Sequence, residues 1–171
     1  MDKVSGEIHA GGCLWPLLLS FLLLSISYHI FPVGYATAST EGRIAVEYFD
    51  PSPASQSQKY AFKAHRQTIG EIDHVWPVNA LAFHPIHNTF ASGGSDSTVS
   101  IWDHKVKKRL KQYKAYRAPV SSLAWNCDGG KLAVGVGYTW DEGEEGVKGA
   151  ERPGIFIREV GEEVKVCMPS N

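Results

Sequence analysis

The chain has 171 residues, 43% of them hydrophobic, and its 17 lysines and arginines nearly balance its 18 aspartates and glutamates, which gives a formal net charge of −1. This length and apolar content suffice for one domain with a packed core. The balanced charge argues against a general nucleic-acid binder and against a disordered acidic chain. The three cysteines are scattered and form no Cys-x-x-Cys pair, which argues against a disulfide framework and against a zinc site.

The beginning of the chain differs from the rest. Residues 14–31 form an apolar run without a charge, and its length suits a signal peptide or a short membrane anchor. Only Lys3 precedes it as a basic residue, beside Asp2 and Glu7, which is a poor start for a secretory signal. The other interpretations are a buried strand and a segment foreign to the domain, such as an aberrant start. Of these interpretations, we expect that the segment is foreign to the domain.

From residue 41 onward, short β-type runs alternate with turn residues, which is the pattern of an all-β repeat protein. The first two runs cover residues 42–50 and 59–65. Residues 51–58 between them are rich in Pro and Ser, and we expect a flexible loop there.

Two later segments align on each other. Residues 77–83 (PVNALAF) match residues 119–125 (PVSSLAW), so the repeat has a period of 42 residues. This lies within the roughly 40–45 residues of a WD-type propeller repeat. A strand of small residues follows each segment, at 89–94 and at 131–136. Small residues suit the inner strands that crowd around a propeller's channel.

The complete repeat carries the residues of the WD hydrogen-bond network. Trp102 would be the donor, Ser92 the relay and Asp96 the final acceptor, with a histidine between Ser92 and Asp96. An indole can only donate, so a hydroxyl is its natural partner. We predict His74 for the histidine position because it has the usual short spacing to the next strand, whereas His65 needs an insertion. The role expected for this network is structural.

The remaining segments complete the predicted fold. We interpret the basic residues 105–114 as an exposed outer strand rather than an RNA surface, residues 141–145 as a solvated acidic loop and residues 154–160 as the last strand. The repeats amount to about two and a half blades, whereas propellers have roughly 4–8. Open sheet edges would then be an aggregation liability unless other material covers them. The predicted fold class is all-β, a partial WD40 β-propeller behind a hydrophobic non-propeller segment.

Sequence motifs for catalysis or for cofactors are missing. The chain has no G-x-S-x-G, P-loop or Rossmann fingerprint. His84 and His87 lie three residues apart, but in a turn without an acidic or thiol ligand, so we interpret them as hairpin residues and not as metal ligands. We therefore expect no enzyme, no cofactor and no metal.

Several ungapped motifs resemble the mitotic spindle-checkpoint WD-repeat proteins of the Bub family. The resemblance covers residues 34–165, so the chain divides into three predicted parts: a hydrophobic segment at 1–33, C-terminal WD-repeat blades at 34–165 and a tail at 166–171. The nuclear-pore mRNA-export WD-repeat proteins are similar too, although the PSP and KKRL segments favour the checkpoint family. The motifs that carry the resemblance are EGRIAVEY (41–48), YAFKAHR (60–66), FHPIHNTFA (83–91), GGSD (93–96), KKRL (107–110) and GIFIR (154–158).

The resemblance implies a part of a seven-bladed propeller that acts in the nucleus and at kinetochores. Such proteins bind a short peptide of the checkpoint kinases across the top face and dock phosphorylated threonine motifs of the kinetochore scaffold. Ubiquitin and the anaphase-promoting complex are further candidate partners, whereas no direct nucleic-acid or membrane partner is expected. Arg43 and Arg66 match basic top-face residues, with Trp76 and Asn79 as weaker candidates for the peptide site.

Independent physical reasoning supports the two arginines, because a guanidinium offers a rigid fork of donors to a carboxylate or phosphate. Without the resemblance, an ordinary ion-paired surface role would be the simpler interpretation. Three alternatives for the whole chain stay open. They are an mRNA-export protein that binds a nucleoporin peptide, a membrane-anchored or secreted fragment, and a truncated non-functional form whose missing N-terminal blades leave the groove incomplete.

Overall fold

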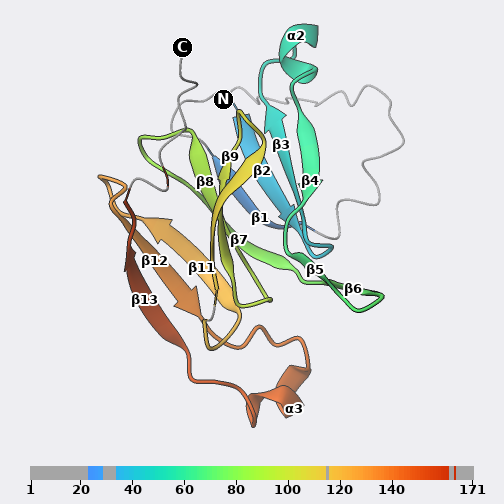
Figure 1. Ribbon diagram of the computed structural model, residues 1–171, viewed down its shortest axis with the longest axis vertical. Helices are drawn as coiled ribbons and strands as arrows, with labels where there is room; N and C mark the ends of the chain where they lie inside the picture. The colour runs from blue at the N-terminus through green and yellow to red at the C-terminus, as the bar shows by residue number, and fades with distance from the viewer. Residues whose placement is uncertain (1–22, 29–33, 115, 162–163, 165–171) are drawn as a thin grey trace, which may run out of the picture.

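The computed structural model describes four parts of the chain (Figure 1), namely residues 23–28, 34–114, 116–161 and 164. The predicted 166–171 tail and most of the 1–33 segment, including the largest part of the apolar run, lie outside the described residues. Among the described residues, no helix is long and apolar enough to cross a membrane.

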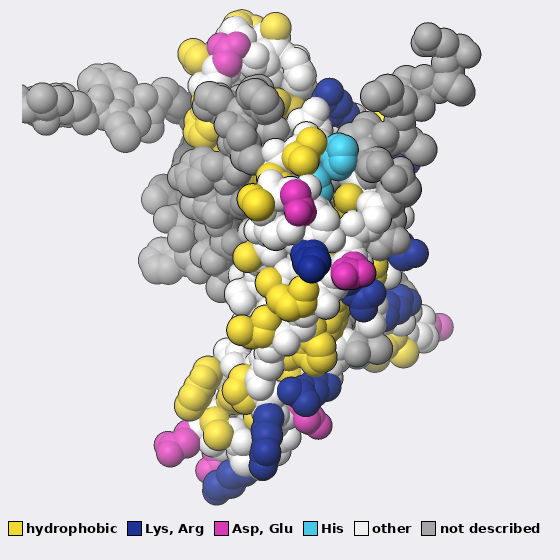
Figure 2. Space-filling view, turned by 90° about the vertical axis from the view of Figure 1, so that its left-hand side faces the viewer, with side chains coloured by type: hydrophobic (Ala, Val, Ile, Leu, Met, Phe, Trp, Pro, Cys, Tyr) yellow, Lys and Arg dark blue, Asp and Glu magenta, His cyan; other side chains and the backbone are white. Residues whose placement is uncertain are grey.

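Antiparallel sheets dominate the structure, and three of them stack as propeller-like blades. Blade A consists of β1 (Leu23–Tyr28), β2 (Gly34–Ser39), β3 (Arg43–Tyr48) and β4 (Tyr60–Lys63). Blade B consists of β7 (Val78–Phe83), β8 (Thr89–Gly94), β9 (Val99–Asp103) and β10 (Lys108–Tyr113). Blade C consists of β11 (Val120–Trp125), β12 (Lys131–Val136) and β13 (Gly154–Glu159). The side of the molecule that carries β13 faces the viewer in Figure 2.

The blades follow the sequence periodicity. In blade B, Leu81 lies opposite Ser92, and in blade C, Leu123 lies opposite Val134. Blade C thus repeats the register of blade B 42 residues later, including a bulge after the first residue of its first strand. The all-β class and the propeller-like architecture predicted from the sequence are confirmed.

Three segments differ from the expectation at the level of single elements. Residues 51–58 contain the short helix α2 (Pro53–Gln56), which the Ser52 hydroxyl caps by accepting a hydrogen bond from Ser55 N (3.3 Å). The acidic loop contains a second short helix, α3 (Gly143–Val147). The stretch after His65 forms a separate hairpin of β5 (Arg66–Ile69) and β6 (Ile72–Val75), which the sequence analysis did not predict.

The first strand of blade A comes from the segment that the sequence analysis placed outside the domain. Its backbone pairs antiparallel with β2, from Leu23 opposite Ser39 to Tyr28 opposite Tyr35. This pairing corresponds to the strand interpretation of the segment. The domain boundary after residue 33 stays a prediction.

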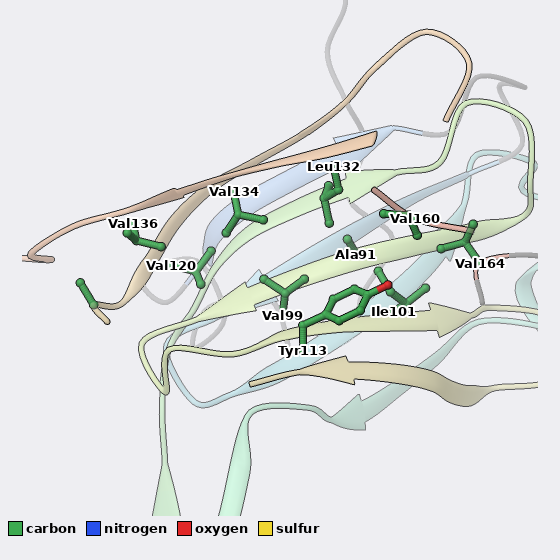
Figure 3. Close-up of a cluster of buried hydrophobic side chains, with 11 residues drawn as sticks. Ala91, Val99, Ile101, Tyr113, Val120, Leu132, Val134, Val136, Val160 and Val164 are labelled. Atoms are coloured by element: carbon green, nitrogen blue, oxygen red, sulfur yellow. The ribbon is translucent and has the colours of Figure 1, made fainter. Parts of the chain in front are cut away.

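Two apolar clusters hold the blades together. The first lies between blades A and B and joins Ile44 and Val46 to Leu81, Phe90 and Trp102. The second lies between blades B and C and is drawn in Figure 3, with side chains of both sheets pointing toward one another. Its buried members are Ala91, Val99, Ile101, Tyr113, Ala118, Val120, Leu132, Val134, Val136, Val160 and Val164.

Small residues on the inner strands set the spacing between the blades. A Cβ atom on Gly93 would collide with the side chain of Val120 in blade C. A Cβ atom on Gly94 would lie 2.6 Å from His65 Nδ1. Since larger residues cannot fit at these contacts without a shift of backbone or ring, the small-residue strand predicted at 89–94 is a condition of blade stacking.

Candidate functional site

A buried chain of hydrogen bonds ties blade A to blade B. Trp102 Nε1 donates to Ser92 Oγ (2.8 Å), and Ser92 Oγ lies 2.9 Å from His65 Nε2. His65 Nδ1 lies 2.8 Å from Asp96 Oδ1, and Asp96 also accepts from the hydroxyl of Thr98 (2.9 Å). If Ser92 donates to Nε2, a neutral His65 with its proton on Nδ1 satisfies every partner of this chain. The structure therefore brings together Trp102, Ser92 and Asp96.

The prediction of His74 for this network is wrong, because His65 occupies the position. His74 lies in the exposed strand β6, where its ring stacks on that of Trp76 with 5.7 Å between the ring centres. The reason is the hairpin of β5 and β6. The hairpin begins directly after His65 and ends beside the same residue, where Trp76 N donates to the His65 carbonyl (3.0 Å). The usual spacing to the next strand therefore falls on a residue of the inserted hairpin.

The candidate binding surface begins at the turn between β2 and β3. Gly42 has a φ of +65°, which favours glycine, and its carbonyl accepts from Ala64 N (2.8 Å). A Cβ atom on Gly42 would lie 2.9 Å from the carbonyl oxygens of both His65 and Trp76. The turn is thus packed against the point where the hairpin leaves and re-enters blade A. This packing fixes the backbone from which Arg43 extends.

Arg43 and Arg66 converge on Glu41 from two different strands. Arg43, at the start of β3, is exposed and has its Nε 3.9 Å from a carboxylate oxygen of Glu41. Arg66, at the start of β5, is half-buried and donates through Nη2 to the Glu41 backbone carbonyl (2.8 Å). Two guanidinium groups therefore lie around Glu41, Arg43 near its carboxylate and Arg66 on its backbone carbonyl. These three side chains together carry one net positive charge.

The Arg66 guanidinium is incompletely satisfied. Its Nε is buried and has no hydrogen-bond partner among the described residues. A buried donor without a partner costs free energy, on the order of 1–3 kcal/mol. Because Nε is closed to solvent, an acceptor from solvent could contact only the exposed part of this half-buried guanidinium. Such a group is suited to an anionic oxygen of a carboxylate or phosphate.

The other two predicted site residues lie in different surroundings. Trp76 is half-buried beside Gly42 and stacks on His74, so it belongs to the same region as the two arginines. Asn79 instead joins blade B to blade C, because its Nδ2 donates to Val120 O (2.9 Å) and to Ser95 Oγ (3.0 Å). The surface of Glu41, Arg43, Arg66 and Trp76 is called the arginine surface below.

The hairpin of β5 and β6 projects beside the arginine surface, away from the end that carries α2 (Figure 1). It exposes the apolar side chains of Ile69 and Ile72 near its turn. The hairpin gives the arginine surface an apolar neighbour next to its cationic groups. No sequence signal other than the insertion itself could have located it.

A cavity of about 770 Å³ lies between blades A and B at their opposite end. Val46 and Phe83 contribute apolar surface to it, and Tyr48, Lys105 and Lys107 contribute polar groups. None of the predicted site residues lines this cavity. The cavity is therefore separate from the arginine surface.

His84 has the role expected of a hairpin residue. Its Nδ1 accepts from the backbone amides of Ile86 (3.1 Å) and His87 (3.0 Å), and its Nε2 lies 3.1 Å from the Gly129 carbonyl in blade C. Burial lowers the pKa of His84, as does the nearby His87, although the bond to Gly129 opposes the shift. Both ring nitrogens are engaged in backbone contacts. Within the described parts of the chain, no group of three or more His, Cys, Asp or Glu residues could hold a metal ion.

The comparisons with known proteins agree with this architecture. Residues 57–103 match the family model "WD domain, G-beta repeat". The chain is 53% identical over 133 residues to mitotic checkpoint protein BUB3.1 of Arabidopsis thaliana, which covers 77% of the chain and 38% of that relative. It is 56% identical over 112 residues to mitotic checkpoint protein bub3 of Dictyostelium discoideum, covering 66% of the chain and 34% of the relative.

A second group of relatives is more distant. Protein Rae1 of Drosophila melanogaster is 36% identical over 135 residues, which covers 78% of the chain and 38% of that relative. The chain thus spans little more than a third of the length of the curated relatives that it matches.

Proposed function

We propose that the chain is a binding scaffold of the spindle assembly checkpoint, because residues 57–103 match the WD-repeat family model and the chain is 53% identical over 133 residues to a mitotic checkpoint protein. In this proposal the chain binds short peptides and performs no catalysis. It acts in the nucleus and at kinetochores, where a protein with such relatives would meet checkpoint kinases and the kinetochore scaffold.

The half-buried guanidinium of Arg66 is the observation that carries the proposal. It uses Nη2 for a contact to the Glu41 carbonyl, and its Nε has no hydrogen-bond partner among the described residues. Arg43 adds a second cationic group beside the same glutamate. Clusters of arginine are a standard means of recognising phosphorylated or acidic peptide motifs. A phosphorylated threonine is therefore the group that we propose for this surface.

The residues beside the two arginines indicate which other side chains the peptide would carry. Trp76 offers an aromatic face, and the projecting hairpin offers Ile69 and Ile72. These groups favour a peptide that carries an apolar residue close to its phosphothreonine. Asn79 is not part of this proposal, since its amide already bridges two blades.

Peptide capture tests the proposed function. The chain would be immobilised beside full-length BUB3.1 and exposed to three peptides, namely a checkpoint-kinase peptide, a phosphothreonine peptide from the kinetochore scaffold and its unphosphorylated form. We expect both proteins to retain the kinase peptide and the phosphorylated form in preference to the unphosphorylated one. Retention by BUB3.1 alone would contradict the proposal and would support a truncated, non-functional form.

A nucleoporin peptide serves as the fourth probe, because the 36% identity to Rae1 favours an mRNA-export protein as the second candidate function. The identity to checkpoint proteins is higher, at 53% and 56%. We therefore expect weaker capture of the nucleoporin peptide than of the kinase peptide. The reverse order would support the second candidate.

A further inference from the structure

The cavity between blades A and B is a second candidate binding site. It lies at the end of the two blades that carries α2, whereas the hairpin beside the arginine surface projects away from that end (Figure 1). Its volume of about 770 Å³ falls within the range of pockets that hold small ligands, roughly 300–1,000 Å³. All of its described lining residues belong to blades A and B or to the segments that join their strands. The cavity is therefore formed between two blades that this chain itself supplies.

One part of the cavity wall is apolar. Val46 of β3 is buried, and the rings of Tyr48 and Phe83 beside it are half-buried. Ser57 and Gln58, which follow α2, add uncharged polar groups on the blade A side. None of the described lining residues is acidic. A ligand in this cavity would place an apolar group against the wall and would meet no negative charge from these residues.

Two lysines bring positive charge to the blade B side of the cavity. Lys105 and Lys107 line it from the turn between β9 and β10, and both are exposed. Neither lysine forms an ion pair within the parts of the chain that the structure describes. Two ammonium groups without a carboxylate partner, placed beside an apolar wall, favour an anionic ligand that also has an apolar part.

Hydrogen bonds from both blades hold the turn that carries these lysines. Asp103 Oδ1 accepts from the backbone amides of Lys105 (2.8 Å) and Val106 (3.1 Å). From blade A, the Tyr60 hydroxyl donates to the His104 carbonyl (3.1 Å). Burial raises the pKa of Tyr60, which keeps this hydroxyl protonated as a donor. The lysines thus extend from a backbone that is positioned before any ligand arrives.

Lys107 has a backbone conformation that favours glycine. Its φ is +55°, in the left-handed region that a long side chain adopts only with strain. Its Nζ lies 4.6 Å from the centre of the Tyr60 ring, which is a cation–π contact with blade A. Strained backbone of this kind gathers at sites that clamp a ligand. The turn therefore directs one ammonium group across the gap between the two blades.

We propose that this cavity binds an acidic peptide segment, with an apolar side chain of the peptide against Val46 and Phe83 and its carboxylates beside Lys105 and Lys107. An ammonium group attracts a carboxylate as a point charge, whereas none of the described lining residues offers the guanidinium fork that suits phosphate. The two lysines belong to one turn, so they match a few adjacent carboxylates better than the long row of phosphates in a nucleic acid. The site is separate from the arginine surface and does not depend on the phosphothreonine proposal.

Fluorescence polarisation with short labelled peptides tests the site. The probe is the peptide EEFFEE, and its two controls are QQFFQQ, which has no charge, and EEGGEE, which has no apolar side chain. We expect the unmodified chain to bind EEFFEE at least about 5-fold more tightly than either control peptide, because each control lacks one of the two contacts. Equal affinity for EEFFEE and QQFFQQ would show that the lysines do not take part in binding.

Lysine substitutions locate the bound probe. The test variants are Lys105→Gln and Lys107→Gln, and the matched control is Lys114→Gln, since Lys114 is exposed directly after β10 and does not line the cavity. We expect each test variant to weaken EEFFEE binding by about 5-fold and the control to weaken it by less than about twofold. Arg66→Ala should leave this affinity unchanged, because Arg66 lies at the other site. Circular dichroism shows whether each variant is folded, and Lys105→Gln carries the test if Lys107→Gln is not.

Four results would overturn the proposal. Two of them are no binding of EEFFEE to the folded chain and an equal loss of affinity in Lys114→Gln, which would indicate a general attraction to the basic strand. The third is a loss of EEFFEE binding in Arg66→Ala, which would place the probe on the arginine surface. The fourth is displacement of EEFFEE by a short RNA at a lower concentration than by unlabelled EEFFEE, which would identify a nucleic-acid site.

Discussion

His65 links two blades, because it follows the last strand of blade A and places its Nε2 2.9 Å from the hydroxyl of Ser92 in the inner strand of blade B. Its Nδ1 lies 2.8 Å from Asp96, in the turn that precedes β9. The side chain of His65 is 1% exposed, so water cannot replace these partners. The imidazole ring of His65 thus adds a polar link to the apolar cluster that joins blades A and B.

Replacing this ring should weaken the fold. The substitution His65→Ala leaves Ser92 and Asp96 without their shared partner, and we expect it to lower the free energy of unfolding by about 2–3 kcal/mol. Urea unfolding followed by tryptophan fluorescence measures the change. His74→Ala is the matched control, because His74 is exposed in the hairpin, and we expect it to change stability by less than about 0.5 kcal/mol. Equal effects of the two substitutions would contradict the assignment of His65.

A methyl group at the contact between blades B and C should also destabilise the protein. Gly93→Ala would press a Cβ atom against Val120, and overpacking of this kind costs about 1–3 kcal/mol. The control is Gly149→Ala, since no atom lies within 4 Å of a Cβ placed there. Thermal unfolding measures the stability of both variants, and we expect Gly93→Ala to unfold at a lower temperature than Gly149→Ala. A stability of Gly93→Ala equal to that of Gly149→Ala would show that the blades are less tightly packed than described.

Acid should weaken the contact of His84 with blade C. Burial lowers the pKa of this residue in the folded chain below its ordinary value of 6.5, so the unfolded chain binds more protons near that pH. Stability is then fully present above pH 6.5 and falls as the pH decreases through 6.5 toward the lower folded pKa. Chemical unfolding at pH 7.5 and pH 5.5 measures this difference. We expect His84→Gln to reduce the difference, and an unchanged difference would remove His84 as its source.

Asn79 should affect stability and not recognition. Asn79→Ala removes the bond to the Val120 carbonyl between blades B and C, and we expect a loss of about 1–2 kcal/mol in the free energy of unfolding. Phosphopeptide affinity should stay within twofold of that of the unmodified chain at a temperature where both are folded. A loss of affinity in a folded Asn79→Ala variant would support the prediction from the sequence that this residue belongs to the binding site.

Much of the fold could be predicted because repetition is visible in one sequence. The 42-residue spacing of residues 77–83 and 119–125 predicts the strands that blades B and C share, and the residues Trp102, Ser92 and Asp96 meet as their types suggest. The hairpin of β5 and β6 could not be predicted in this way, since it occurs once and packs little of its surface. The same insertion places His74 at the short spacing to the next strand that the network histidine usually has.

The candidate site was only partly accessible to sequence reasoning. The resemblance selected Arg43 and Arg66, but only the structure shows that both approach Glu41 and that one guanidinium nitrogen is buried without a partner. Asn79 is only a weaker candidate for the peptide site in the sequence. A bulge after Val78 instead accompanies its contact with Val120.

The affinity of the Arg66→Ala variant for a phosphothreonine peptide tests the central claim most directly. Fluorescence polarisation would compare the phosphorylated and unphosphorylated peptides on the unmodified chain, on Arg66→Ala and on the control Arg152→Ala, whose arginine is exposed in the segment before β13. Because a hydrogen bond to a charged group contributes about 1.5–3 kcal/mol, we predict that Arg66→Ala weakens binding of the phosphorylated peptide by about 10-fold or more. Arg66→Ala should change the affinity for the unphosphorylated peptide little, and Arg152→Ala should change the affinity for either peptide little. Equal affinity of Arg66→Ala and the unmodified chain for the phosphorylated peptide would contradict the account.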